Sequence, residues 1–331
     1  SGSKSFVDGG VRALMNSGKG FLWVGTVGDG LKTFDLASKT FSEVDLVHQD
    51  ENIGNTIQAI MRDHEGNLWL GTEGEGLIKY MPDRSSDYTR GRTVNYRVYP
   101  EPFPSQTLLN DFIMCLLEDS HQNIWIGTWY GLSLIESSER EKKDPSNIVI
   151  KNFLHDPSDS LSISSNTIMD LMEDKNGNIW IGTRNGLNKV IHTKTGYKFK
   201  HNFHNRNGRD LLEKKILDVY QGAGQDIWFS TQSGGVACLD KQSGIYKEYT
   251  SKNGFHNNVV NSIIKDSSGI FWFGTNNGLC RYQPINKVYK IFTKDDGLNS
   301  ENFLFKSNCR EEDNIYVGTN RGLTVFTPAK L

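Results

Sequence analysis

The segment Ile179-Trp-Ile-Gly-Thr-Arg-Asn-Gly-Leu187 carries the pattern that decides the fold. An aromatic residue is followed by glycine two positions later, by threonine, and then by a glycine-leucine pair that closes a turn. The pattern recurs along the chain, and its aromatic anchors are Trp23, Trp69, Trp125, Trp180, Trp228, Trp272 and Tyr316. Successive anchors are 46, 56, 55, 48, 44 and 44 residues apart, a period typical of solenoids and propellers.

A strand with two buried faces is expected before each anchor. Apolar residues stand twelve positions before the anchor, as at Ile168 and Leu304, and nine positions before it, as at Leu171, with Ser307 the exception in the last copy. Because these positions are an odd number apart, they point to opposite faces of a strand. The pattern indicates the innermost strand of a propeller blade, which lies between two neighbouring blades.

Turn residues separate the expected strands. Aspartates that cap turns through backbone N–H groups stand six residues before four of the anchors, at Asp63, Asp119, Asp174 and Asp266. After the anchor, Asn185-Gly186 and Asn277-Gly278 predict hairpins with type I′ turns. Each repeat is therefore expected to form a four-stranded antiparallel meander. The whole chain, residues 1–331, is predicted to be all-β, a single seven-bladed β-propeller.

The two ends of the chain suggest how the ring closes. The last copy stops after its third strand, at Pro328, whereas residues 4–7 resemble the end of a fourth strand at Lys290–Thr293. We therefore expect residues 4–7 to form the closing strand of the last blade, which removes the exposed sheet edges. Residues 1–3, Ser-Gly-Ser, are interpreted as a remnant of a cloning vector.

Composition excludes several classes of protein. The 331 residues include 37 Lys and Arg against 39 Asp and Glu, a balance that does not favour binding to nucleic acid or to an acidic membrane surface. No apolar run is long enough to span a bilayer. The four cysteines lack metal-ligand spacing and are interpreted as small buried hydrophobic residues.

The repeat resembles the regulator propeller of bacterial hybrid two-component sensors of the Bacteroides type. The resemblance covers essentially the whole chain, with departures at Ser230, Tyr316, Gly28 and Gly74. It implies one propeller of a periplasmic sensor region, more specifically the second of two, in a receptor that detects oligosaccharides. It also implies contacts with an adjacent propeller and an immunoglobulin-like domain of the same chain, and a homodimeric receptor whose histidine kinase lies elsewhere.

Motifs that carry chemistry are missing from the sequence. Gly28-Asp-Gly30 and Gly74-Glu-Gly76 lack the third glycine of a dinucleotide site and are interpreted as turns. His201 and His204 form an H-x-x-H whose odd spacing places the rings on opposite faces of a strand, which disfavours a metal pair. The sequence therefore predicts no catalytic residues, no metal and no cofactor.

Candidate binding residues are those that break the repeat. The turns between second and third strands, together with the loops between blades, emerge on one face of a propeller, where function is expected. On this face Trp129 and Tyr130 replace the polar residues of other blades, and flat aromatic rings suit sugar rings and protein interfaces. Equivalent turns carry Arg184, Gln232 and Arg321, which could hold hydroxyls or an acidic sugar.

Other functions remain open at this point. Trp129 could instead pack on the long loop 100–110 or on a neighbouring domain. A propeller lyase of the streptogramin-lyase type is the competing enzyme class, although its repeat follows the anchor with a different element and no cluster of His and Glu is seen on the candidate face. A purely structural propeller that binds other proteins is the third possibility.

Overall fold

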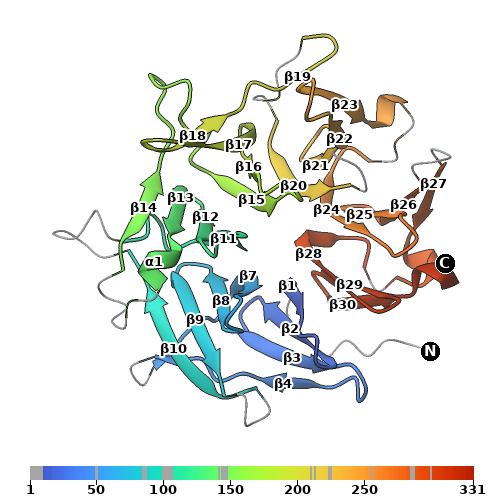
Figure 1. The fold of residues 1–331 in the computed structure, drawn as a ribbon. Coiled ribbons are helices and arrows are strands. Elements are labelled where there is room, and N and C mark those ends of the chain that lie inside the picture. The colour runs from blue at the N-terminus through green and yellow to red at the C-terminus, as the bar shows by residue number, and fades with distance from the viewer. Residues whose placement is uncertain are drawn as a thin grey trace.

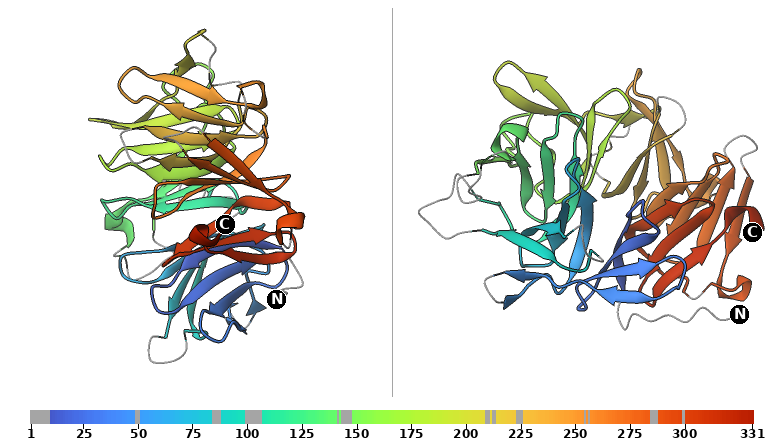
Figure 2. Two further views of the ribbon diagram at one scale, coloured as in Figure 1. Left: turned by 90° about the vertical axis from the view of Figure 1, so that its right-hand side faces the viewer. Right: turned by 60° about the horizontal axis from the view of Figure 1, so that its bottom comes forward.

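A computed structural model describes residues 10–48, 51–83, 88–98, 107–140, 142, 148–208, 211, 214–222, 226–253, 255, 257–283, 288–298 and 300–331. These residues form a ring of seven antiparallel sheets around a central channel, as Figure 1 shows. Seen from the side, the sheets stack around the ring like the blades of a fan (Figure 2). The prediction of a seven-bladed β-propeller is confirmed. The predicted closing strand, residues 4–7, and the remnant, residues 1–3, lie outside the described residues.

Each blade starts with its innermost strand. The strands of the first four blades are β1 (Val11–Asn16), β2 (Phe21–Thr26), β3 (Leu31–Asp35) and β4 (Phe41–Glu43); β7 (Ile57–Arg62), β8 (Leu68–Thr72), β9 (Leu77–Pro82) and β10 (Gly91–Tyr96); β11 (Ile113–Glu118), β12 (Ile124–Thr128), β13 (Gly131–Ile135) and β14 (Ile150–Phe153); β15 (Ile168–Glu173), β16 (Ile179–Thr183), β17 (Gly186–Thr193) and β18 (Gly196–Lys200). The strands of the last three blades are β20 (Ile216–Gln221), β21 (Ile227–Thr231), β22 (Val236–Leu239) and β23 (Ile245–Tyr249); β24 (Val260–Lys265), β25 (Phe271–Thr275), β26 (Leu279–Gln283) and β27 (Val288–Phe292); β28 (Phe303–Glu311), β29 (Asn314–Thr319) and β30 (Gly322–Phe326).

Short elements decorate the ring. A two-stranded ribbon, β5 (Val47–His48) with β6 (Glu51–Asn52), follows the first blade, and β19 (His204–Asn205) adds a parallel fifth strand to β23. The helical pieces are α1 (Ser137–Arg140) and single 3-10 turns at Ser251–Asn253, Lys294–Asp296 and Pro328–Lys330. Only His204 of the H-x-x-H lies in a strand.

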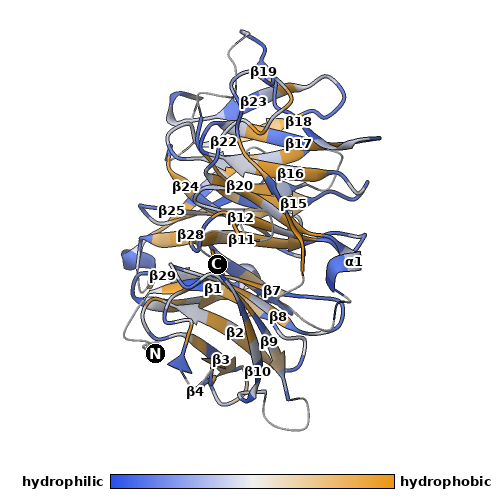
Figure 3. Ribbon diagram, turned by 90° about the vertical axis from the view of Figure 1, so that its left-hand side faces the viewer, coloured by the Kyte–Doolittle hydropathy of each residue, from blue (hydrophilic) through white to orange (hydrophobic). Residues whose placement is uncertain are grey.

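The core consists of seven hydrophobic clusters, and each is shared between two neighbouring blades. Trp125 of the third blade packs in one cluster with Ile168, Ile179 and Ile181 of the fourth. The other anchors repeat this arrangement, so every anchor is buried between two neighbouring blades. Hydrophobic residues gather in the strands, where they alternate with hydrophilic ones, and the turns are mostly hydrophilic (Figure 3). Hydrophobic burial therefore stabilises the contacts between sheets rather than any one sheet alone.

The glycine two residues after the anchor, present in six of the seven blades, permits this close packing. A Cβ atom on Gly71 would lie 2.7 Å from Ile113 of the next blade, and one on Gly182 would lie 2.9 Å from Ile216. Neither contact leaves room for a side chain. The glycine that recurs in the sequence pattern is thus a site of close approach between blades.

The last blade departs from the pattern in its innermost strand. In the fourth blade Ile168 pairs with Thr183 and one residue is bulged before pairing resumes. In the last blade Phe303 pairs with Thr319, and pairing resumes only at Asn308 with Val317. Phe303 is fully buried, whereas Leu304 is only partly buried. The assignment of Leu304 as the equivalent of Ile168 is therefore wrong, because the longer bulge and a shorter hairpin shift the count.

The turn type predicted for the hairpins is also wrong. Among these residues only Gly186 and Gly278 have positive φ, at 95° and 99°, whereas Asn185 and Asn277 do not. A type I′ turn needs positive φ at both central positions. The anchor-side threonine replaces it: Thr183 Oγ1 donates to Gly186 O at 2.9 Å and accepts from Asn185 N at 3.1 Å.

The ring closes by packing of the first blade against the last. Tyr316 of β29 lies in one cluster with Val11, Leu22 and Val24 of the first blade. Ser307 Oγ also donates to Val11 O at 2.7 Å. In Figure 1 the first strands and the last strands accordingly lie side by side.

Candidate functional site

The turns between second and third strands line one face of the ring and join neighbouring blades. The turn glycine donates its N–H to the start of the next blade, from Gly131 to Asn166 O at 2.6 Å and from Gly186 to Lys214 O at 2.8 Å. The residue after the threonine donates within its own blade, from Trp129 to Phe112 O and from Arg184 to Thr167 O, both at 3.0 Å. The predicted meeting of these turns with the loops between blades is confirmed.

Trp129 and Tyr130 project from this face. Their side chains are 50% and 52% exposed, the largest aromatic exposure among the described residues. Among the described aromatic residues, Phe112 packs against the indole of Trp129, edge to face, with ring centroids 5.2 Å apart. Phe112 thus covers part of Trp129, and half of the residue stays open to a ligand or a partner.

Arg184 and Gln232 continue from this pair around the ring. The turns of Trp129 and Arg184 bond to the consecutive residues Asn166 and Thr167, so the two turns are neighbours. In the same way the turn of Gln232 bonds to Lys215 O at 3.1 Å, next to the residue that receives Gly186. We call Trp129, Tyr130, Arg184, Lys215 and Gln232 the turn-face arc.

Lys215 is a member of the arc that the sequence analysis missed. Burial lowers its pKa, and the positive charge of Arg184 lowers it further. The two cations therefore lie near one another, without an ion pair in the described part of the chain. An unpaired pair of cations is suited to a ligand that carries acceptors or negative charge.

Arg321 is not part of the arc. It lies exposed in the turn between β29 and β30 of the last blade, where its N–H donates to Thr319 Oγ1 at 3.1 Å. The turn of the sixth blade lies between it and Gln232 in chain order. The structure thus places four of the five residues selected from sequence on three consecutive blades. The fifth, Arg321, lies on a blade that is not adjacent to these three.

The central channel holds a second polar centre, which the sequence analysis did not select. Lys306, in the long bulge of β28, adopts a φ of 49° and directs its ammonium group to Asp170 of β15. Asp170 accepts from Val219 N and Asp218 accepts from Ile263 N, at 2.7 and 2.6 Å. A pocket of about 320 Å³ lies beside this group and is lined by residues of all seven innermost strands.

The charges in the channel depend on one another. Burial lowers the pKa of Lys306, but the carboxylates of Asp170 and Asp218 raise it overall. Burial and the charge of Asp170 raise the pKa of Asp218 well above its usual range, although Lys306 opposes this. The two aspartates thus favour the charged form of Lys306, whereas the charged form of Asp218 is disfavoured. The long bulge re-aims a side chain of the last blade across the ring.

The repeated aspartates serve the blades. Asp119 Oδ1 accepts from Asn123 N at 2.9 Å, and Asp119 Oδ2 accepts from the indole N–H of Trp125 at 2.8 Å. The same indole bond is made by Asp63, Asp174 and Asp266. Burial alone would raise the pKa of Asp174, but hydrogen bonds from Lys241, Trp180 and Asn178 lower it overall. Their interpretation as turn caps is confirmed, and the indole bond adds a link to the anchor.

The described residues offer little else for catalysis or metal binding. They contain no group of three His, Cys, Asp or Glu side chains placed to hold a metal ion. The four cysteines are free thiols; Cys115 and Cys280 are buried, and Cys238 and Cys309 are partly buried. Within the same residues no helix has the length and apolar character needed to cross a membrane.

The ring and its repeated anchors define a repeat protein of the seven-bladed propeller class. Four segments, residues 53–74, 107–130, 162–185 and 254–277, match the family model described as "Two component regulator propeller". Each matched segment begins a few residues before an innermost strand and ends in the turn after the anchor. The chain thus carries repeats that match this family model, and the resemblance drawn from its sequence is confirmed.

Known proteins agree with this classification. The chain is 25% identical over 216 residues to histidine kinase P4 of Formosa agariphila, a match that covers 63% of this chain and 15% of that protein. Its fold is similar to the extracellular domain of BT3049 from B. thetaiotaomicron, assigned as a hybrid two component system, with a TM-score of 0.75, 23% identity and coverage of 99% of this chain and 40% of that chain. The chain thus spans less than half of either relative.

The fold is also similar to that of an enzyme. Virginiamycin B lyase from Staphylococcus aureus matches with a TM-score of 0.64 and 13% identity, over 97% of this chain and 94% of that chain. Identity this low carries the propeller architecture alone, because unrelated functions share this fold.

Proposed function

We propose that this chain is a sensor propeller of a hybrid two-component receptor, located outside the cytoplasm, in the periplasm, and that it takes part in recognising an oligosaccharide. The regulator repeats and the similarity to the extracellular domain of BT3049 support the role. The chain itself is not an enzyme in this proposal. The kinase acts elsewhere in a longer protein, of which this ring is one part.

The turn-face arc is the observation that carries the proposal. Two exposed aromatic rings, Trp129 and Tyr130, lie next to Arg184 and Gln232, whose side chains have no hydrogen-bond partner in the described part of the chain. Aromatic faces bind the C–H surfaces of sugar rings, and guanidinium and amide groups bind their hydroxyls. Such a combination of apolar faces and a few polar groups is typical of ligand sites.

Transmission of the signal follows from where the arc lies. An adjacent propeller and an immunoglobulin-like domain of the same chain are the proposed partners on this face, in a homodimeric receptor. Suppose that the dimer has two arrangements and that a ligand lies between the arc and a partner. The ligand shifts the dimer toward the arrangement that it binds more tightly, by no more than the difference between its two binding free energies. Arg321 would contribute to such a contact from the far side of the ring.

Isothermal titration against a panel of defined oligosaccharides tests the proposal. The double variant Trp129→Ala and Tyr130→Ala is expected to weaken binding at least about tenfold, since stacking on each ring contributes on the order of 1 kcal/mol. The matched control, Asn276→Ala with Asn277→Ala, changes the same turn of the sixth blade and is expected to bind like the native protein. Unchanged binding by the aromatic double variant would contradict the proposal. Loss of dimerisation of the longer receptor without loss of sugar binding would indicate a protein-interaction surface instead.

A further inference from the structure

A pocket on the opposite face of the ring combines aromatic rings with unpaired cations. It lies between the first two blades, at the turns that join first to second strands, and has a volume of about 520 Å³. This size falls within the usual range for small-molecule sites. Residues that line it and matter here are Lys19, Phe21, Trp23, Arg62 and Tyr88. We call it the lower pocket.

The first blade has a serine in place of the turn aspartate beside the lower pocket. Ser17 stands where Asp63, Asp119, Asp174 and Asp266 stand in four other blades. The turn backbone is retained, with Ser17 N donating to Phe21 O at 3.2 Å as Asp63 N donates to Asn67 O at 2.9 Å. The shorter serine hydroxyl donates to Phe21 O and accepts from Lys19 N, and it makes no hydrogen bond to the indole within the described residues.

Trp23 is consequently an anchor with an unused donor. Its side chain is buried, with 3% of the residue exposed, yet its indole N–H has no hydrogen-bond partner in the described chain. The indoles of Trp69, Trp125, Trp180 and Trp272 each donate to their aspartate at 2.8 to 2.9 Å. Because Trp23 lines the lower pocket, this N–H can donate to an acceptor bound there.

Two cations that line the pocket have no carboxylate partner. Lys19 lies over the ring of Tyr88, with its Nζ 4.5 Å from the ring centroid, and donates to the Tyr88 hydroxyl. Arg62 donates one N–H to Ser17 O at 2.6 Å and makes no ion pair within the described residues. The remaining N–H groups of both side chains are available to an anion.

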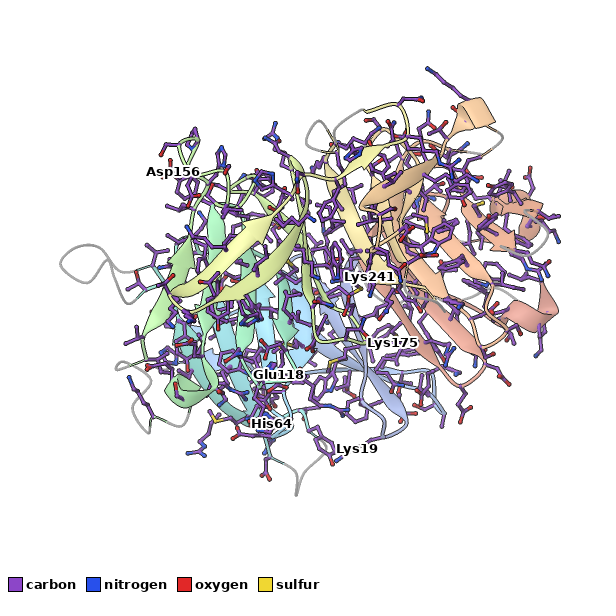
Figure 4. The ribbon with its side chains drawn as sticks, turned by 45° about the horizontal axis from the view of Figure 1, so that its top comes forward. Lys19, His64, Glu118, Asp156, Lys175 and Lys241 are labelled. Atoms are coloured by element: carbon purple, nitrogen blue, oxygen red, sulfur yellow. The ribbon has the colours of Figure 1, made fainter. Side chains whose placement is uncertain are left out.

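The carboxylates around the pocket, in contrast, already have partners. Arg140 donates to both Asp63 and Glu118, and His64 lies 2.7 Å from Glu118. Glu65 accepts from Asn67 and lies 3.9 Å from Lys79. Figure 4 shows His64 beside Glu118, with Lys19 farther along the same side of the molecule. The local charge left without a partner is therefore positive.

An aromatic wall accompanies these donors. The rings of Phe21 and Tyr88 are 5.6 Å apart, and Phe21 meets Trp23 edge to face at 5.2 Å. Tyr88 is held with a φ of 66°, a conformation that bulky residues rarely adopt, and its carbonyl accepts from the Tyr80 hydroxyl at 2.9 Å. Strain of this kind is concentrated at ligand sites.

We propose that the lower pocket binds a carboxylate carried on a six-membered ring. The carboxylate would accept from Trp23, Lys19 and Arg62, and the ring would lie against Phe21 and Tyr88. A uronic acid and an aromatic acid share this chemistry. The site is separate from the turn-face arc, because turns between first and second strands emerge at the opposite strand ends from turns between second and third strands.

Calorimetric titration of the chain with D-glucuronate and with benzoate tests the proposal, with D-glucose and benzyl alcohol as the neutral counterparts. At least one acid is expected to bind, and its neutral counterpart at least about tenfold more weakly. Binding of glucuronate alone identifies a sugar acid, and binding of benzoate alone an aromatic acid. Absence of binding by both acids overturns the proposal.

Ser17→Asp is the decisive variant. It restores the residue of the other blades, so it is expected to bind the Trp23 indole, to keep or raise the melting temperature, and to abolish binding of the acid. Lys19→Ala and Arg62→Gln are each expected to weaken binding about tenfold. Lys194→Ala, which removes one charge from an exposed hairpin, is the matched control and is expected to bind normally.

Two results would overturn the assignment even if an acid binds. One is unchanged affinity in a folded Ser17→Asp variant, and the other is equal loss in Lys19→Ala and Lys194→Ala. The Trp129 and Tyr130 double variant should bind the acid normally. Failure at the lower pocket is thereby distinguished from failure of the turn-face arc.

Discussion

Two tryptophans four residues apart in the third blade occupy opposite surroundings. Trp125 is fully buried, packs on the fourth blade and donates to Asp119. Trp129 is half exposed and touches a single ring, that of Phe112. The first occupies a position that all blades share and the second a position where one blade differs. Shared positions stabilise the ring, and differing positions are free for recognition.

The largest effect is expected from truncating a shared position. Trp125→Ala removes an indole from a packed interface and should lower the free energy of unfolding by about 3–5 kcal/mol. Trp129→Ala should change it by less than about 0.5 kcal/mol, because no packed interface is disturbed. Urea denaturation of both variants provides the measurement. Similar losses in the two variants would contradict the division between shared and differing positions.

Lys306 belongs to neither kind of position, because it differs from the repeat and yet lies inside the ring. Lys306→Met leaves Asp170 without its cation and should lower the free energy of unfolding by about 1–3 kcal/mol, less than for a fully buried pair because the ammonium group is partly solvated in the channel. Adding Asp170→Asn to the same protein should restore part of the loss. Equal stability of Lys306→Met and the native protein in urea would rule out a stabilising role for the pair.

The aspartate beside an anchor is expected to have a smaller effect. Asp119→Asn keeps one side-chain oxygen, which can still accept from the backbone N–H of Asn123. It loses the oxygen that accepts from the Trp125 indole and the Asn123 amide, which should lower the free energy of unfolding by about 1–2 kcal/mol. Asp240→Asn is the control, since Asp240 caps an exposed turn through Gln242 and touches no anchor. Thermal melts of the two variants should separate clearly. Coincident melts would show that the indole bond adds nothing to the turn.

The smallest effect is expected from the pH dependence of the channel. Because the pKa of Asp218 is raised in the fold, its contribution to stability is present below its unfolded pKa and is lost as pH rises through its folded pKa. Asp218→Asn removes this loss. The stability of the variant relative to the native protein should therefore increase, on the order of 1 kcal/mol, between about pH 4 and pH 7. A constant difference across that range in urea titrations would contradict the raised pKa.

Most of the fold could be predicted because it depends on repeated local patterns. The anchors, the close-approach glycines and the aspartate caps recur, and each was assigned from spacing alone. The turn type was missed because the Asn-Gly pair alone indicates a type I′ turn. In the structure the threonine hydroxyl makes the hydrogen bonds of the turn instead. The innermost strand of the last blade was misaligned. Its bulge is longer and its hairpin is shorter than in other blades, so the distance to the anchor changes little and hides both differences.

The candidate sites were only partly accessible from sequence. Trp129 was found because it breaks a turn pattern, and the same filter applied to strands would have selected Asp170 and Asp218, where other blades have Ala, Cys or Ser. Lys306 stands ten residues before its anchor, as Asp170 and Asp218 do before theirs, so the same filter would have selected it as well. The lower pocket depends on a missing residue, Ser17 in place of aspartate, and its meaning became clear only with the hydrogen bonds of the other anchors.

The sharing of every hydrophobic cluster between two blades affects how the chain is made. During synthesis the first blade emerges with Leu22 and Val24 uncovered, and their partner Tyr316 follows about 290 residues later. Contacts so distant along the chain form slowly, and the apolar edge stays open to other molecules until they do. Packing of the first blade against the last, which closes the ring, can therefore take place only after the last blade has been synthesised. A nascent ring is vulnerable to aggregation until its final blade has been released from the ribosome.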